Sequence, residues 1–152
     1  MEREAAERIL RHVGASASET VDIAGAALAL ASFDRPRVAV ERYHQHLAAL
    51  ASDVARAAGG TESLSEQLDA MNTTLVGQYG YSGDELNYDD MQNANLMRVI
   101  DRRKGLPVAL GILYIHVARA QGWSMTGLAF PGHFLLRLDG GNARLVIDPF
   151  HG

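Results

Sequence analysis

The strongest constraint in this 152-residue chain is a change of periodicity at Gly122. Before Gly122, apolar side chains recur at helical spacing, and most of the alanines occur in the first part of this region. After it, short apolar segments flank a glycine-rich turn. Alanine favours helices, whereas aromatic residues favour strands. The order of the two patterns predicts an α+β fold, with N-terminal helices packed on a small antiparallel sheet.

Several local patterns mark the ends and faces of the predicted helices. Ser16 with Glu19 and Ser63 with Glu66 have the spacing of a capping box. The segment at 36–58 has an apolar stripe at helical spacing and ends at Gly59 and Gly60; the stripe comprises Tyr43, Leu47, Leu50 and Val54.

Capping residues, glycines and prolines divide the helical region into about six segments. We expect Pro36 and Pro107 in the first turns of their helices and Asn93 as an N-cap. The stretch from Gly77 to Asp90 breaks the periodicity and is predicted to be a long, functional loop. The predicted helices lie at about residues 1–11, 21–32, 36–58, 64–75, 93–104 and 107–121.

Composition excludes several classes of protein. The chain has no cysteine, which excludes disulfides, cysteine-ligated zinc, iron–sulfur clusters and a cysteine nucleophile. Its 14 basic and 18 acidic residues give a net charge of −4, which argues against binding to nucleic acid. No apolar run approaches a membrane span of about 18 residues. We expect one cytoplasmic domain over residues 1–152, with no cofactor and no membrane contact.

The sequence Asp-Gly-Gly-Asn at residues 139–142 is a strong hairpin signal. With Gly140 and Gly141 at the centre of the turn, His133 lies directly opposite Asp148 and Arg137 opposite Arg144. The other face of the hairpin is apolar and is predicted to face the core; it carries Phe134, Leu136, Leu138, Leu145 and Ile147.

The predicted pairing of His133 with Asp148 has a chemical meaning. A carboxylate that accepts the Nδ1–H of a histidine fixes its tautomer and raises its basicity, as in nucleophile–His–Asp sites. An ordinary local hydrogen bond is the simpler reading. His151 could complete a metal site with these two residues, but a histidine beside a chain end is more often solvated, so we predict no metal.

The other polar clusters have simple structural explanations. His44 and His46 lie two residues apart on a helix and are expected at the surface, whereas His116 is expected in the core. Basic residues near the end of the 93–104 helix suit its macrodipole. The acidic cluster lacks the spacing of a calcium loop and is predicted to be solvated; it comprises Asp84, Glu85, Asp89 and Asp90.

Four blocks of sequence, in order, resemble the SirB1 family. They are GDELNYDDMQNANL at 83–96, RRKGLP at 102–107, FPGHF at 130–134 and IDPF at 147–150. The resemblance extends over roughly residues 20–152 and implies a transglutaminase-like domain. Bacterial members often continue into TPR-like helices where this chain ends, and some are described as regulators of a neighbouring gene. A related domain occurs in a eukaryotic F-box protein.

The resemblance also implies a site. Transglutaminase-like proteins place a cysteine at a helix start and a histidine and an aspartate on adjacent antiparallel strands. His133 and Asp148 match the last two, but Pro107 stands where the cysteine would be. Many SirB1-like proteins carry Ser or Thr two residues further on, where this chain has Ala109, and Ala94 replaces another usual serine. No nucleophile stands at a matched position.

These departures predict a non-catalytic, transglutaminase-like domain that binds a protein or peptide in the inherited cleft. An unconventional amidase or peptidase, in which His133 and Asp148 activate water or a hydroxyl, is the alternative. A purely structural partner for C-terminal helices is a third possibility. The expected binding residues are Asn87, Tyr88, Asn93, Arg103 and Pro107.

Overall fold

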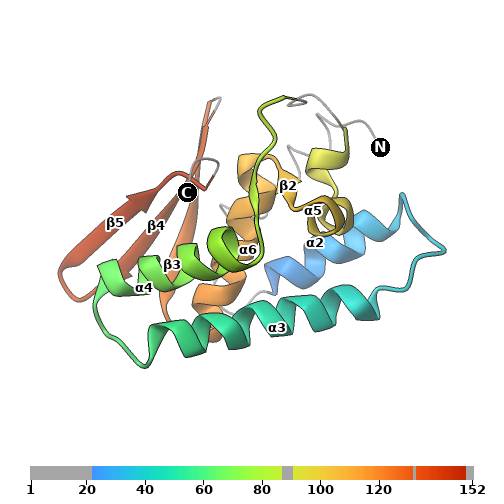
Figure 1. Cartoon of the computed structure of the whole chain (residues 1–152). Coiled ribbons are helices and arrows are strands. Elements are labelled where there is room, and N and C mark those ends of the chain that lie inside the picture. The colour runs from blue at the N-terminus through green and yellow to red at the C-terminus, as the bar shows by residue number, and fades with distance from the viewer. Residues whose placement is uncertain (1–21, 87–90, 132, 150–152) are drawn as a thin grey trace.

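The computed structural model describes residues 22–86, 91–131 and 133–149 (Figure 1). The predicted helix at 1–11 and the capping signature of Ser16 and Glu19 lie outside these ranges. None of the described helices is long and apolar enough to cross a membrane. The helical elements are α2 (Ile23–Ser32), α3 (Glu41–Ala58), α4 (Leu64–Asn72), the π-helical η1 (Thr73–Gln78), the 3-10 helix η2 (Met91–Ala94), α5 (Leu96–Arg102) and α6 (Pro107–Ala120).

The strands form two small sheets. β1 (Ser82–Gly83) and β2 (Lys104–Gly105) pair in parallel. The second sheet is antiparallel, with the order β3-β4-β5, and follows α6 directly along the chain. Its strands are β3 (Ser124–Phe130), β4 (His133–Gly140) and β5 (Ala143–Ile147). The predicted α+β fold, with helices first and an antiparallel hairpin last, is confirmed.

Helix α6 is the centre of the core. Ten of its 14 residues are buried, because its sequence is apolar on nearly every side. It packs against α3 and against strands β3 and β4, and Figure 1 shows it between the sheet and helices α2 and α5. The predicted stripe of α3 also faces this core, with Tyr43, Leu47, Leu50 and Val54 all buried. His116 is half-buried and hydrogen-bonds to the Leu47 carbonyl at 3.1 Å, in line with the expected core role.

Gly111 allows α6 to lie close to the sheet. A Cβ atom at this position would stand 2.6 Å from a ring carbon of Phe134, which is 1% exposed. We therefore expect Gly111→Ala to lower the free energy of unfolding by about 1–2 kcal/mol, because overpacking costs about 1–3 kcal/mol while helix propensity returns up to about 1 kcal/mol.

Chemical denaturation would measure this loss, and Gly77→Ala supplies the matched control. Gly77 lies in the helical η1, and a Cβ there would meet nothing within 4 Å. The control should be neutral or slightly stabilising. Equal effects of the two substitutions would contradict the close packing of α6 against Phe134.

The predicted register of the β4–β5 hairpin is wrong by two residues. Gly140 pairs with Ala143, so Gly141 and Asn142 form the turn, and only Gly141 needs a positive φ, of 56°. The predicted register would have set Arg137 against Arg144, which is an unfavourable pair of like charges. In the observed register Arg144 lies opposite Asp139, with its Nε 3.7 Å from the carboxylate.

A shift of two residues preserves the faces of the strands. The predicted apolar face is therefore confirmed: Phe134, Leu136, Leu138 and Ile147 are buried and Leu145 packs against the core. The cross-strand partners of the polar residues differ from the prediction, because Arg137 lies opposite Val146 rather than Arg144.

Two predicted helix starts are also wrong. Pro36 is not in the first turn of α3, which begins at Glu41. Instead it follows Arg35 in a turn closed by a 3.1 Å bond from the Val38 N–H to the Arg35 carbonyl, and proline suits that second position. The N-cap of α5 is Asn95, whose side chain accepts a hydrogen bond from the Arg98 N–H. By contrast, Ser63 caps α4 as predicted.

Candidate functional site

The start of α6 is held by two segments that are distant in sequence. The Leu106 N–H donates to the Asn93 carbonyl at 3.1 Å, and the Asp84 N–H donates to the Gly105 carbonyl at 3.3 Å. Pro107 then occupies the first turn of α6, where its missing N–H costs nothing. Asp84 and Asn93 thus fix the start of α6, the position that the sequence resemblance matches to the cysteine of transglutaminase-like proteins.

Arg102 joins the same two segments through its side chain. Its guanidinium donates to the Asp84 carboxylate at 2.8 Å and to the Asn93 side-chain oxygen at 2.9 Å. Asp84 is 2% exposed, so the prediction of a solvated acidic loop is wrong at this residue. A carboxylate leaves water only where charge and hydrogen bonds compensate it, and Arg102 provides both.

A second cluster lies beside Arg103. This residue ends α5 in a left-handed conformation, with φ 63°, and its guanidinium lies over the rings of Tyr79 and Tyr81 at 5.4 Å and 5.2 Å. The imidazole Nε2 of His46 is 2.7 Å from the Tyr81 hydroxyl. His46 is therefore half-buried, and its predicted surface position is wrong, whereas His44 is exposed as expected.

This environment disfavours a charge on His46. Burial, and then the positive charge of Arg103, lower the pKa of His46 to about 4. Burial also raises the pKa of Tyr81. The sequence did contain a signal for this position, because His46 lies three residues after Tyr43 and four before Leu50 and so flanks the buried stripe of α3.

His133 and Asp148 lie near each other in the sheet, but they are not directly opposed. His133 begins β4 and Asp148 follows the last residue of β5, and both are exposed. Continuing the observed register places Asp148 opposite Leu135 and diagonal to His133. Diagonal neighbours are about 7–8 Å apart in the backbone. The predicted direct opposition is wrong, and the hydrogen bond between the two side chains stays a prediction.

The topology brings His133 to the N-terminal end of α6. Strand β3 starts four residues after α6 ends and runs back along it, so the β3–β4 turn lies toward the start of the helix. The close approach of Phe134 to Gly111, one turn after Pro107, agrees with this placement. The matched histidine and the matched helix start therefore occupy one end of the molecule.

The predicted binding residues lie in different environments. Asn87 and Tyr88 fall outside the described residues. Asn93 is fully buried, whereas Arg103 and Pro107 are half-buried. Within the described ranges, no group of three His, Cys, Asp or Glu residues could hold a metal ion. His151, the third residue of the metal alternative, is not among the described residues.

The outer face of the antiparallel sheet carries apolar side chains that were not among the predicted binding residues. Phe130 pairs with His133 across β3 and β4, and 50% of its surface is exposed. Val146 on β5 is 62% exposed. Between them, Leu128 pairs with Leu135, and both are half-buried. We call this set of residues, with His133, the outer sheet face; it offers apolar contacts beside an imidazole.

An α+β domain with a histidine at the start of one antiparallel strand, an aspartate directly after the neighbouring strand and a buried helix that begins near the histidine has the architecture of a transglutaminase-like protein. The sequence model of the transglutaminase-like superfamily matches residues 41–152, and the chain belongs to this superfamily. No solved structure matches the chain.

Relatives occur in bacteria and in animals. A "UPF0162 protein" of Xylella fastidiosa is 43% identical over 86 residues, which are 57% of this chain and 31% of the relative. A "UPF0162 protein" of Vibrio cholerae is 31% identical over 135 residues, which are 88% of this chain and 50% of the relative. The human "F-box only protein 21" is 36% identical over 89 residues, which are 59% of this chain and 14% of that protein. The matched parts therefore cover at most half the length of these relatives.

Proposed function

We propose that this domain is a SirB1-type member of its superfamily that binds a protein or peptide on the outer sheet face and does no thiol chemistry. The observation that carries the proposal is the combination of Pro107 at the start of α6 with apolar groups exposed beside His133. Without cysteine, the chain lacks the nucleophile that a covalent thiol mechanism requires. A cytoplasmic location, as expected from the sequence, stays a prediction.

The composition of the outer sheet face supports a peptide or protein as its partner. A few side chains, often aromatic, contribute most of the binding energy at protein interfaces, and apolar side chains around them exclude water. Phe130 and Val146 supply such groups, and the His133 imidazole and the Asp148 carboxylate add polar contacts at the same end. In the antiparallel sheet, β3 and β5 are the outer strands, and an extended peptide can add to a strand of this kind.

The proposal predicts that Phe130 is a principal binding residue. A library of random peptides displayed on phage would be selected against the wild-type domain, and the selected peptide measured by calorimetry. We expect Phe130→Ser to weaken its binding at least about tenfold, as truncation of an interface aromatic usually does. Phe33→Ser is the matched control, because Phe33 is 77% exposed and lies directly after α2.

Equal weakening by both substitutions, or selection of no peptide at all, would contradict the binding proposal.

The enzyme alternative needs a separate measurement with glutamine, amide and ester substrates. We expect no turnover that His133→Ala abolishes. Reproducible turnover that is lost in this variant would favour a hydrolase, with His133 as the base.

A further inference from the structure

A cavity lies at the opposite end of α6 from the proposed binding surface. It has a volume of about 300 Å³ and is formed where α3 ends, α4 begins and β3 begins. Its polar and aromatic lining comes from Thr61, Glu62, Gln67, Gln121 and Trp123. Since α6 has 14 residues, its two ends are separated by about 20 Å. The cavity, here called the Trp123 pocket, is therefore separate from His133.

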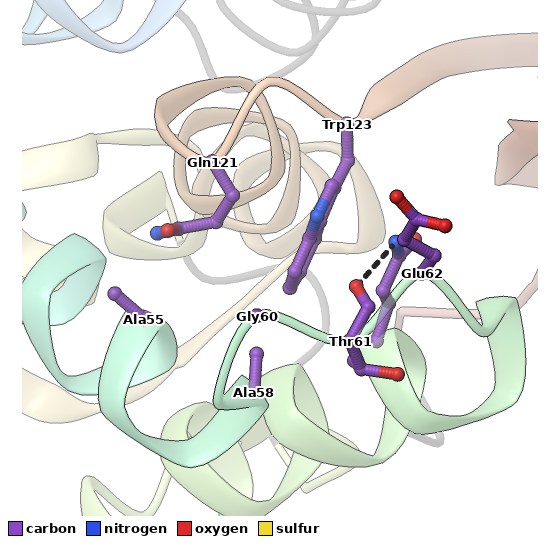
Figure 2. Close-up of a pocket in the computed structure, with 8 residues that line it drawn as sticks. Ala55, Ala58, Gly60, Thr61, Glu62, Gln121 and Trp123 are labelled. Atoms are coloured by element: carbon purple, nitrogen blue, oxygen red, sulfur yellow. Dashed lines mark hydrogen bonds between the residues drawn. The ribbon is translucent and has the colours of Figure 1, made fainter.

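The local sequence explains why the pocket is open. Gly59 and Gly60 both have positive φ, of 59° and 79°, and they end α3 without placing a side chain in the space. Trp123 follows the C-terminal turn of α6, closed by a 3.0 Å bond from its N–H to the Ala118 carbonyl. Figure 2 shows the indole of Trp123 reaching toward Gly60, with Gln121 on one side and Glu62 on the other.

The two glutamines of the pocket are anchored to backbone carbonyls. The amide nitrogen of Gln67 donates to the Thr61 carbonyl at 3.3 Å, and that of Gln121 donates to the Ala51 carbonyl at 2.8 Å. Figure 2 draws the first of these bonds as a dashed line. These bonds fix both glutamine side chains along the lining, and each amide keeps a second N–H and a carbonyl oxygen.

The charge of the pocket is negative. Of the described residues that line it, Glu62 is charged and none is basic. The C-terminal turn of α3, with Ala55 and Ala58, forms one wall, and a helix C-terminus favours a positive charge. The face of the Trp123 ring attracts cations in the same way. Three independent features therefore favour a positively charged ligand.

We propose that the Trp123 pocket binds the cationic side chain of a lysine or arginine residue. An ammonium or guanidinium group would lie between the Glu62 carboxylate and the indole face, while the methylene stem contacts the apolar part of the ring. A volume of about 300 Å³ is at the lower end for ligand sites and suits one side chain. This site goes beyond the proposed function and needs neither His133 nor the outer sheet face.

The pocket contains its own reporter, because Trp123 is the single tryptophan of the chain. Fluorescence titrations would compare the Nα-acetyl methylamides of lysine and arginine with their neutral counterparts, Nε-acetyllysine and citrulline. We expect dissociation constants on the order of millimolar for the cations and binding at least about fivefold weaker for the neutral compounds. Added salt should weaken the binding of the cations.

Matched substitutions test the role of Glu62. Glu62→Gln keeps the shape of the side chain and removes its charge, and it should weaken binding of the cations about threefold, the usual range for an exposed ion pair. Asp69→Asn removes the same charge from an exposed position of α4 outside the lining and should change nothing.

Several results would contradict the proposal that the Trp123 pocket binds a cationic side chain. No fluorescence change with any probe, equal binding of charged and neutral compounds, or equal effects of Glu62→Gln and Asp69→Asn would each do so. Tighter binding of a neutral sugar, such as a methyl glucoside, would assign the pocket to another class of ligand. Because none of these measurements involves Phe130, their failure would leave the proposed peptide surface to its own test.

Discussion

Replacing Arg102 with methionine should lower the free energy of unfolding by about 3 kcal/mol. The substitution leaves the Asp84 carboxylate, which is 2% exposed, without the guanidinium that lies 2.8 Å away. Removing one partner of a buried ion pair costs about 3–5 kcal/mol, and we take the lower end because the Arg102 side chain is 26% exposed. The melting temperature should fall by roughly 6–12 °C, as measured by calorimetry.

The same substitution should loosen the start of α6. Arg102 also holds the side chain of Asn93, whose backbone carbonyl accepts the Leu106 N–H. We therefore expect faster hydrogen exchange at the Leu106 amide than in wild type. This links a loss of stability to the helix start that the sequence resemblance matches to the cysteine position.

A double-mutant cycle distinguishes the ion pair from a general effect of the substitution. In an Asp84→Asn background the charge is gone, and Arg102→Met should cost at least about 1 kcal/mol less than in wild type. Arg98→Met, on the same helix one turn earlier, should stay within about 0.5 kcal/mol of wild type. An undiminished effect in the Asp84→Asn background would show that the pair does not carry the stability.

The sequence was informative where one local pattern decides the structure. The apolar stripe of α3, proline at the start of α6 and glycine at the end of α3 each follow from neighbouring residues, and the structure has all three. The inward face of the hairpin was also predictable, because strand faces alternate with a period of two.

The position of the hairpin turn was harder to predict, because more than one pair of residues within 139–142 could form a two-residue turn. A further criterion was present in the sequence. Only the observed register places Asp139 rather than Arg137 opposite Arg144, and cross-strand charges of opposite sign are favourable. The glycines and the charge pairs together therefore indicate the observed register.

The exposure of Asp84 and of His46 was predicted wrongly for a different reason. Asp84 is buried because Arg102, 18 residues later, reaches it, and His46 is covered by tyrosines that follow more than 30 residues later. Composition and spacing describe only neighbours along the chain, so they gave both residues a solvated position. The resemblance marked the segments at 83–96 and 102–107 as important but did not indicate that they contact each other.

Acidification should destabilise the domain through His46. Its pKa is about 4 in the folded protein and about 6.5 in the unfolded chain. Above pH 6.5 both states are neutral and the stability is fully present. As the pH falls from 6.5 to 4, the unfolded state takes up the proton first and the free energy of unfolding decreases. The difference of about 2.5 units corresponds to at most about 3.4 kcal/mol, and partial exposure reduces the expected loss to about 2–3 kcal/mol.

Other groups titrate in the same range, so the contribution of His46 must be isolated by substitution. His46→Gln removes the titrating imidazole, and its stability relative to wild type should rise by about 2–3 kcal/mol between pH 7 and pH 4. His44→Gln, at an exposed position two residues earlier on α3, is the matched control substitution. Urea denaturation at several pH values measures both. If NMR places the His46 titration near 6.5, the imidazole is not held neutral by burial and Arg103, and the predicted pH dependence disappears with it.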